Sequence, residues 1–212
     1  MKVERKKIYD LLLRLSHFGI AFSTLLLIIS AYTANYFWEE GLIRKSFWVV
    51  HIFSGYAFSL CLVARILWGL VGPEHARWSK LWKWKEWMQF LKSKNFNPPW
   101  DWGHHPLAAI AYIVFYFVSV FISLSGLILA GIEHNLGPFA PAFYDHLLYK
   151  KDLLEIHETL SLMIIIFIFA HILTLYWHEK IDKIPTIQSM FSGFQYKRKK
   201  SKEDENENSK NN

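Results

Sequence analysis

The sequence predicts an all-α membrane protein: a bundle of four transmembrane helices with short interfacial helices and a disordered C-terminal tail. Of the 212 residues, 52% are apolar and only 20% are charged, and the apolar residues are concentrated in blocks. Four blocks reach the roughly 20 residues that a helix needs to cross a hydrocarbon core; they cover residues 12–33, 48–71, 107–132 and 153–177. None shows the strict alternation of polar and apolar residues that is typical of a membrane barrel strand.

The basic residues predict the orientation of these helices. Nineteen Lys and Arg lie at or before the start of the first block, between the second and third, or after the fourth, whereas the other two loops hold only four: Arg44, Lys45, Lys150 and Lys151. Because basic loops stay in the cytoplasm, both termini are expected there. These flanking positions also explain the net charge of +6, so membrane lipid is the expected partner and nucleic acid is not.

Two segments outside the blocks have the pattern of short surface helices. In residues 78–94, tryptophans and leucines recur at near-helical spacing among lysines, a composition typical of a helix in the headgroup region. Between Ile181 and Phe194, apolar residues recur every three or four positions. We therefore expect a membrane domain over residues 1–196 and a tail over 197–212, which has no apolar face and should be disordered.

Four of the ten histidines lie well inside the apolar blocks: His17, His51, His157 and His171. In a helix, the fourteen residues between His157 and His171 place them roughly 21 Å apart along the axis and on nearly the same face. Measured from the centre of each block, His17 lies at the depth of His171 on the cytoplasmic side. His51 lies at the depth of His157 on the outer side. The sequence therefore predicts two histidine pairs at two depths.

Two imidazoles that face each other across a bundle suit six-coordinate haem iron, which takes one axial ligand from each side and carries electrons. Short side chains lie one turn beyond each histidine, where a flat macrocycle must approach the backbone. They are Ala21, Ser54, Gly55, Ser161 and Thr174. Cys61 is the one cysteine in the chain, so no Cys-x-x-Cys-His motif exists to attach haem covalently.

Other uses of membrane histidines have less support. Each histidine could simply hydrogen-bond a neighbouring helix, and the short side chains could serve close helix packing alone. A metal-ion transporter or a proton relay would need Asp or Glu at mid-depth, where the blocks have none. Residues 157–161 begin like a zinc-protease motif, but Ser161 stands where that motif requires its second histidine.

Several stretches resemble the bacterial cytochrome b561 family, in particular the membrane cytochrome b subunits associated with nickel-iron hydrogenases. They are RLSHF at residues 14–18, WVVHIFSGY at 48–56, ARILWGLVGPEHARWSKL at 64–81, LLEIHETL at 153–160 with His171 fourteen residues after His157, and IQSMFSGFQYKRK at 187–199. The resemblance implies a cytochrome b domain in the bacterial inner membrane, with two non-covalent haem b groups.

The resemblance also implies a set of ligands and a function. His17, His51, His157 and His171 all match the haem iron ligands of the family, and the matched depths pair His17 with His171 and His51 with His157. Electrons would pass between membrane quinone and a redox protein on the outer face, such as a hydrogenase or a cytochrome c. The alternative is a stand-alone quinone-dependent oxidoreductase of the same family, which would turn over a quinol without a partner subunit.

Two arginines and two loop histidines are secondary candidates. Arg14, one turn before His17, and Arg65, at the cytoplasmic end of the second block, could pair with haem propionates, although snorkelling would also explain both positions. His104 and His105 could hydrogen-bond or protonate a quinone headgroup at the cytoplasmic interface.

Overall fold

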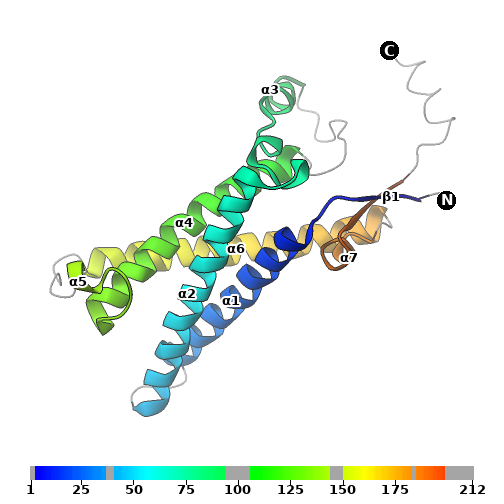
Figure 1. Ribbon diagram of the computed structural model, residues 1–212. Coiled ribbons are helices and arrows are strands. Elements are labelled where there is room, and N and C mark those ends of the chain that lie inside the picture. Colours follow the sequence, from blue (N-terminus) through cyan, green and yellow to red (C-terminus); the bar gives the residue numbers. More distant parts are fainter. Residues whose placement is uncertain (1–2, 37–40, 94–105, 144–149, 183–184, 199–212) are drawn as a thin grey trace, which may run out of the picture.

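The computed structural model describes residues 3–36, 41–93, 106–143, 150–182 and 185–198. Its main elements are four long helices, each long and apolar enough to cross a membrane (Figure 1). They are α1 (Leu11–Tyr36), α2 (Leu42–Val71), α4 (Pro106–His134) and α6 (Lys150–Asp182). The predicted four-helix membrane fold is confirmed, and the chain is a multi-pass membrane protein.

The long helices extend beyond the apolar blocks that predict them. The 33 residues of α6 correspond to a helix of about 50 Å, which exceeds the hydrocarbon thickness of about 30 Å. Its extra turns carry Lys150, Lys151 and Asp152 at one end and Lys180 at the other. Such polar turns suit the headgroup region, so the helix continues after the apolar pattern stops.

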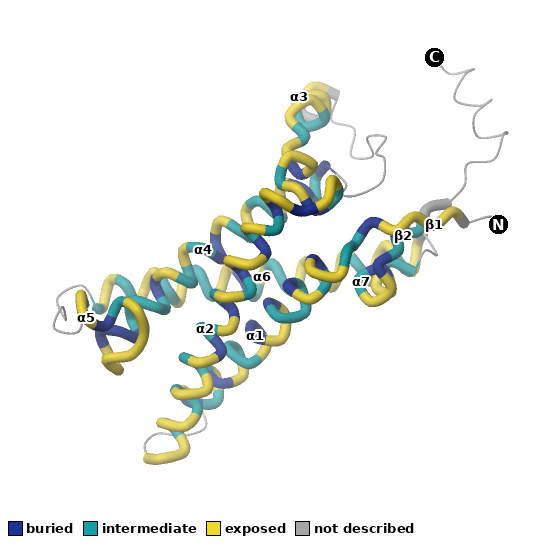
Figure 2. Tube along the Cα trace, in the orientation of Figure 1, coloured by how far each residue is buried: buried dark blue, intermediate teal, exposed yellow. Residues whose placement is uncertain are grey.

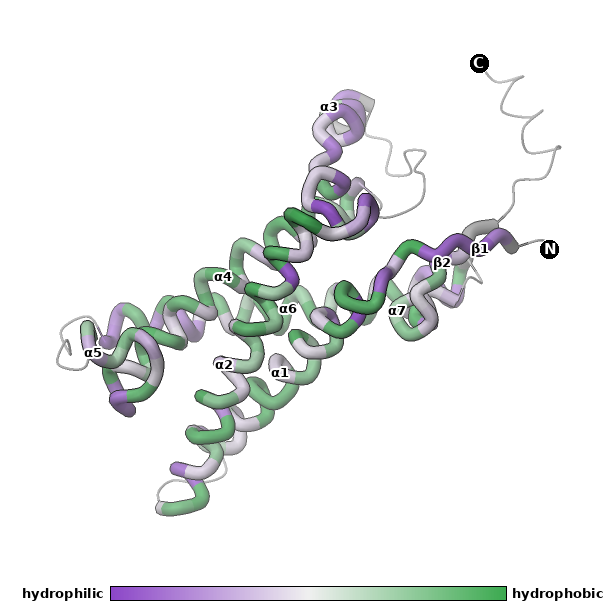
Figure 3. Tube along the Cα trace, viewed as in Figure 1, coloured by the Kyte–Doolittle hydropathy of each residue, from purple (hydrophilic) through white to green (hydrophobic). Residues whose placement is uncertain are grey.

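Large apolar side chains cover the outside of the four helices. Phe22 is 64% exposed, Leu60 72% and Phe169 71%. Figure 2 marks these outer surfaces as exposed, and Figure 3 shows that the long helices are mainly hydrophobic while α3 and the two terminal strands are more hydrophilic. Exposing this much apolar surface to water would be costly. Lipid chains remove that cost.

The four helices pack as two close pairs, α1 with α2 and α4 with α6, and a contact between α2 and α4 joins the pairs. Ile20, Phe58 and Leu62 form the centre of the apolar core. At the crossing of α1 and α2, a Cβ atom added to Gly19 would lie 2.5 Å from the Sγ atom of Cys61. Small residues allow helices in lipid to approach this closely.

Indole groups fasten the loop that follows α2. This loop contains the short 3₁₀ turns η1 (Glu74–Ala76) and η2 (Trp78–Lys80) and the predicted surface helix α3 (Trp84–Ser93). The Nε1 atom of Trp78 donates to the carbonyl oxygen of Ile66 at 2.9 Å, and that of Trp87 donates to the carbonyl oxygen of Pro106 at 2.9 Å. The loop is thereby tied to both α2 and α4.

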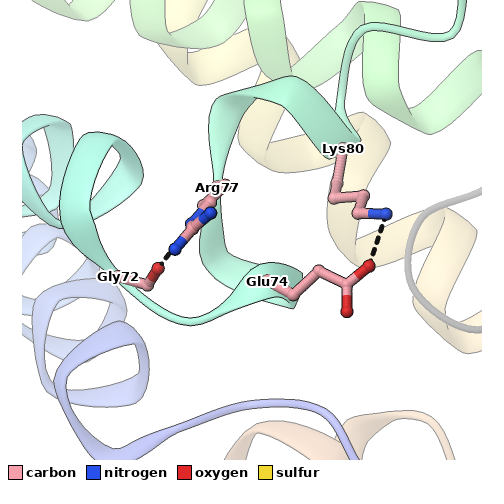
Figure 4. A network of polar contacts seen from close by, with 4 residues as sticks. All are labelled: Gly72, Glu74, Arg77 and Lys80. Carbon is pink, nitrogen blue, oxygen red and sulfur yellow. Dashed lines mark hydrogen bonds and ion pairs between the residues drawn. The ribbon is translucent and has the colours of Figure 1, made fainter.

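Two further contacts shape the turn at the end of α2 (Figure 4). The Arg77 Nε atom donates to the carbonyl oxygen of Gly72 at 2.8 Å. The Lys80 Nζ atom lies 2.6 Å from Glu74 Oε1, and this hydrogen bond holds the pKa of the exposed Glu74 carboxyl below its ordinary value. Both contacts are local and orient the chain toward α3.

The two ends of the chain pair with each other. Strand β1 (Val3–Lys7) is antiparallel to β2 (Phe194–Arg198), which follows the short helix α7 (Ile187–Ser192). Gly193 has a φ of 82°, and its carbonyl oxygen accepts the backbone N–H groups of Ile8 and Tyr9 at 3.0 and 3.1 Å. Both terminal segments therefore lie at the same end of the bundle.

The sequence did not predict this two-stranded ribbon. The predicted tail boundary at residue 197 falls inside β2, so regular structure continues to Arg198. The remainder of the predicted tail, residues 199–212, lies outside the described residues. In the loop between α4 and α6, the structure places a further short helix, α5 (Ala140–Phe143).

Replacing Gly19 with alanine tests the close crossing of α1 and α2. We expect Gly19→Ala to lower the free energy of unfolding by about 1–3 kcal/mol, because the added methyl group overpacks the contact with Cys61. The double variant with Cys61→Ala should recover most of this loss, because it removes the obstructing sulfur atom. Thermal unfolding in detergent of both single variants and the double variant completes the cycle; strictly additive losses would contradict the proposed contact.

Candidate functional site

The structure brings the four membrane histidines together in two pairs. His51 on α2 faces His157 on α6, with ring centroids 6.4 Å apart and ring planes inclined by 72°. His17 on α1 faces His171 on α6, with centroids 6.5 Å apart and planes inclined by 54°. One helix, α6, therefore contributes a histidine to both pairs.

These separations match the requirements of one metal atom between two imidazoles. A metal–imidazole bond is about 2.0–2.1 Å long. In a five-membered ring with bonds near the 1.33 Å C–N length, a nitrogen lies about 1.1 Å from the centroid. Two such rings on opposite sides of a metal therefore have centroids about 6.3 Å apart. Both pairs come close to that value.

The donor set suits haem iron better than a bare metal ion. Among the described residues, no group of three or more His, Cys, Asp or Glu could hold a metal ion. A structural zinc site usually takes four protein ligands and a catalytic site three. In a haem, the macrocycle itself provides four nitrogen ligands, so two facing histidines complete the coordination.

Helix α1 orients the ring of His51. The Nδ1 atom of His51 lies 3.1 Å from the carbonyl oxygen of Leu27 and 3.4 Å from Ser30 Oγ. A carbonyl oxygen can only accept, so Nδ1 carries the proton and Nε2 keeps its free lone pair. This is the usual arrangement of a metal-binding histidine, whose second nitrogen donates to a backbone carbonyl.

A cavity of about 470 Å³ surrounds the His51–His157 pair, and residues of α1, α2, α4 and α6 line it. The volume lies within the range of about 300–1,000 Å³ that is typical of cofactor sites. Gly55, Gly126 and Ser161 are among the lining residues. A Cβ atom at Gly126 would lie 3.0 Å from His157 Cε1, so the imidazole rests almost directly on the backbone of α4.

Aromatic rings surround the His17–His171 pair. The ring of His171 is stacked on Phe167 with centroids 5.9 Å apart, and Tyr112 lies edge-on at 6.3 Å. Phe18 lies edge-on to His17 at 5.7 Å. The buried Nδ1 atom of His17 has no hydrogen-bond partner among the described residues. Ring contacts therefore position His17 and His171, whereas a hydrogen bond to α1 also holds His51.

Arg14, one turn before His17 on α1, forms a hydrogen bond with a distant part of the chain. Its Nη1 atom donates to the carbonyl oxygen of Phe191, which connects α1 to α7, and its Nε atom is buried without a hydrogen-bond partner. Tyr9 is half-buried, and the partial removal of its phenol from water raises the pKa of that group to about 12. The predicted role of Arg14 toward a haem propionate stays a prediction.

Arg65 lies in an aromatic cage. The residue is 5% exposed, and its guanidinium lies 4.7 Å from the centroid of the Trp78 ring and 5.5 Å from that of Tyr116. These contacts stabilise the buried cation by cation–π attraction. Its predicted role toward a propionate stays a prediction, and His104 and His105 lie outside the described residues.

Sequence reasoning missed the contribution of α4, because that helix contains no histidine within its apolar block. Ser125 Oγ lies 2.9 Å from His157 Nδ1, and Gly126 lies directly beside the same ring. The Ser-Gly pair at residues 125–126 was the available signal, in a block that also contains Ser119 and Ser123. Such pairs are also common in ordinary helix packing.

Four membrane-spanning helices define the class as a multi-pass membrane protein, and its helices bring two pairs of histidines face to face. Residues 8–193 match the family model described as prokaryotic cytochrome b561. The chain belongs to the prokaryotic cytochrome b561 family, which confirms the resemblance found in the sequence. It is therefore a membrane cytochrome b, and haem b is its cofactor.

Several proteins of similar sequence are named as B-type cytochrome subunits of Ni/Fe-hydrogenases. The probable Ni/Fe-hydrogenase 1 B-type cytochrome subunit of Escherichia coli (strain K12) is 32% identical over 123 residues, which cover 52% of this chain and 49% of that protein. The match thus spans about half the length of that relative. The probable Ni/Fe-hydrogenase B-type cytochrome subunit of Azotobacter chroococcum mcd 1 is 24% identical, with 88% and 87% covered. That of Rhizobium leguminosarum bv. viciae is 25% identical, with 90% of each chain covered.

The contact of Arg14 with α7 predicts the behaviour of an Arg14→Met variant. We expect faster amide hydrogen exchange in residues 3–10 and 187–198, by roughly tenfold, because a hydrogen bond from a charged donor contributes about 1.5–3 kcal/mol and holds a locally opening segment. Mass spectrometry of both peptides measures the rate, and Lys7→Met, at an exposed position of β1, is the control. Unchanged exchange together with an altered haem potential would instead support the propionate role.

Proposed function

We propose that this chain is an integral-membrane di-haem cytochrome b that transfers electrons between a redox protein on the outer face and membrane quinone. The observation that carries the proposal is the pair of His–His separations, 6.4 and 6.5 Å between ring centroids. Both separations suit a six-coordinate metal. The histidines that α6 contributes to the two pairs, His157 and His171, are fourteen residues apart. A single bis-histidine site would need only one of them.

In this proposal His51 and His157 hold one haem b, and His17 and His171 hold the other. Bound haem supplies reversible one-electron chemistry at iron. The protein presents neutral imidazole nitrogens, fixes the separation of the two sites through α6, and surrounds them with apolar and aromatic side chains that exclude water. Filling both axial positions leaves no open site for oxygen, which suits electron transfer.

The partners are proposed from the relatives and from the charge pattern. The similar proteins are named as hydrogenase B-type cytochrome subunits, which supports a hydrogenase as the outer redox protein; a cytochrome c is the other candidate. Membrane quinone would be the second electron carrier. We place the protein in the bacterial inner membrane with both termini in the cytoplasm, as basic loops favour.

Single histidine variants test the pairing. We expect His51→Ala and His157→Ala to remove the same spectral component, and His17→Ala and His171→Ala to remove the other, because each haem loses an axial ligand. Reduced-minus-oxidised spectra with redox titration of the purified variants measure this. Loss of the same component from His51→Ala and His17→Ala would contradict the pairing. A variant that retains both haems would show that its histidine serves packing only.

The proposed orientation is tested separately with reporter fusions. A periplasmic reporter should be active when fused after Tyr36 and inactive when fused after Ser93, because these positions follow α1 and α3 respectively. A cytoplasmic reporter at the same two positions provides the reciprocal control. The reversed pattern would place the His51–His157 pair on the cytoplasmic side and overturn the proposed sidedness of both haems.

A further inference from the structure

The two histidine pairs differ in how their second ring nitrogen is held, and Ser125 makes the difference at His157. Ser125 is 4% exposed, and its Oγ atom lies 2.9 Å from His157 Nδ1. The same hydroxyl donates its hydrogen to the carbonyl oxygen of Ile122 at 3.0 Å. A serine hydroxyl has one hydrogen, so toward the histidine it can only accept.

This arrangement determines the tautomer of His157. His157 also shares a hydrogen bond with the backbone of Ile122, and a backbone carbonyl can only accept. With Ser125 Oγ as a second acceptor, His157 Nδ1 carries the proton and the Nε2 lone pair stays free for a metal. The chain of donors runs from the imidazole to the serine hydroxyl and ends at a backbone carbonyl. Each hydrogen bond polarises the next, so the imidazole gains electron density. A second partner of this kind raises ligand basicity.

Gly126 fixes the ring in the position where this hydrogen bond forms. A Cβ atom at residue 126 would lie 3.0 Å from His157 Cε1, so the backbone of α4 borders the imidazole on that side. Two consecutive residues of α4 thus constrain His157: one by contact and one by hydrogen bonding. At the inner pair, the buried His17 Nδ1 has no hydrogen-bond partner among the described residues.

We propose that Ser125 is a positioning residue for the outer haem, which fixes the Nδ1–H tautomer of His157 and lowers the reduction potential of the iron that His157 ligates. The inference rests on the proposed haem at the His51–His157 pair. A more electron-rich imidazole stabilises ferric iron over ferrous iron, because the ferric ion carries the greater positive charge. Hydrogen bonding around an axial ligand is an established way for a protein to tune potential.

The test is a redox titration of Ser125→Ala in the purified, haem-loaded full chain. We expect the midpoint potential of the outer haem to shift in the positive direction while the inner haem keeps its wild-type potential. Ser125→Thr retains a hydroxyl and should keep the wild-type value. Ser119→Ala is the matched control, because Ser119 is a fully buried serine of the same helix whose Oγ has no hydrogen-bond partner among the described residues; it should change neither potential.

The remaining outcomes are also decisive. Unchanged potentials in Ser125→Ala with both haems retained, or a Ser125→Thr variant that behaves like Ser125→Ala, would overturn the proposal and leave Ser125 as packing. If Ser125→Ala loses the outer haem, Ser125→Cys, a weaker acceptor, must show the positive shift. The His51→Ala spectrum identifies the outer component. If His51→Ala loses no haem, no haem is bound at the His51–His157 pair and the proposed function fails there. If His51→Ala loses a haem but Ser125→Ala leaves both potentials unchanged, only the proposed role of Ser125 fails.

Discussion

Two pairs of imidazoles must face each other between helices that are embedded in lipid. The rest of the structure depends on this constraint. Each ring must stay near its partner, with centroids 6.4 and 6.5 Å apart, while leaving space between the helices that carry them. The packing reflects this requirement. Helix α6 packs closely against α4, whereas its backbone stays farther from α1 and α2. A cavity of about 470 Å³ lies where the four helices surround the His51–His157 pair.

Much of this arrangement could be predicted because helix geometry in a membrane has few variables. The length of an apolar block fixes a span, and a rise of about 1.5 Å per residue converts each histidine position into a depth. Depth alone was enough to match His17 with His171 and His51 with His157. Depth does not give the rotation of each helix about its axis. In α1 a signal for that rotation was present, because Ser16, Ser23, Thr24 and Ser30 recur at helical spacing and all four are buried.

The features that sequence reasoning missed all depend on contacts between distant segments. The β1–β2 ribbon joins the two ends of the chain, and Arg14 reaches Phe191, 177 residues away. Ser125 and Gly126 act on a histidine 32 and 31 residues farther along the chain. Each of these residues, viewed alone, has an ordinary local role as a strand residue, a snorkelling cation or a helix-packing residue. Their importance emerges only when the helices are assembled.

The number of haems per chain tests the central claim most directly. If both histidine pairs bind haem, each chain holds two haems; if only one pair does, each chain holds one. A pyridine haem assay on the purified protein, divided by a protein concentration from quantitative amino-acid analysis, measures that number. Two haem b per chain, together with a reduced-minus-oxidised spectrum of six-coordinate haem, is the predicted result. A ratio near one would show that only one of the two histidine pairs holds iron, and the absence of haem would contradict the account altogether.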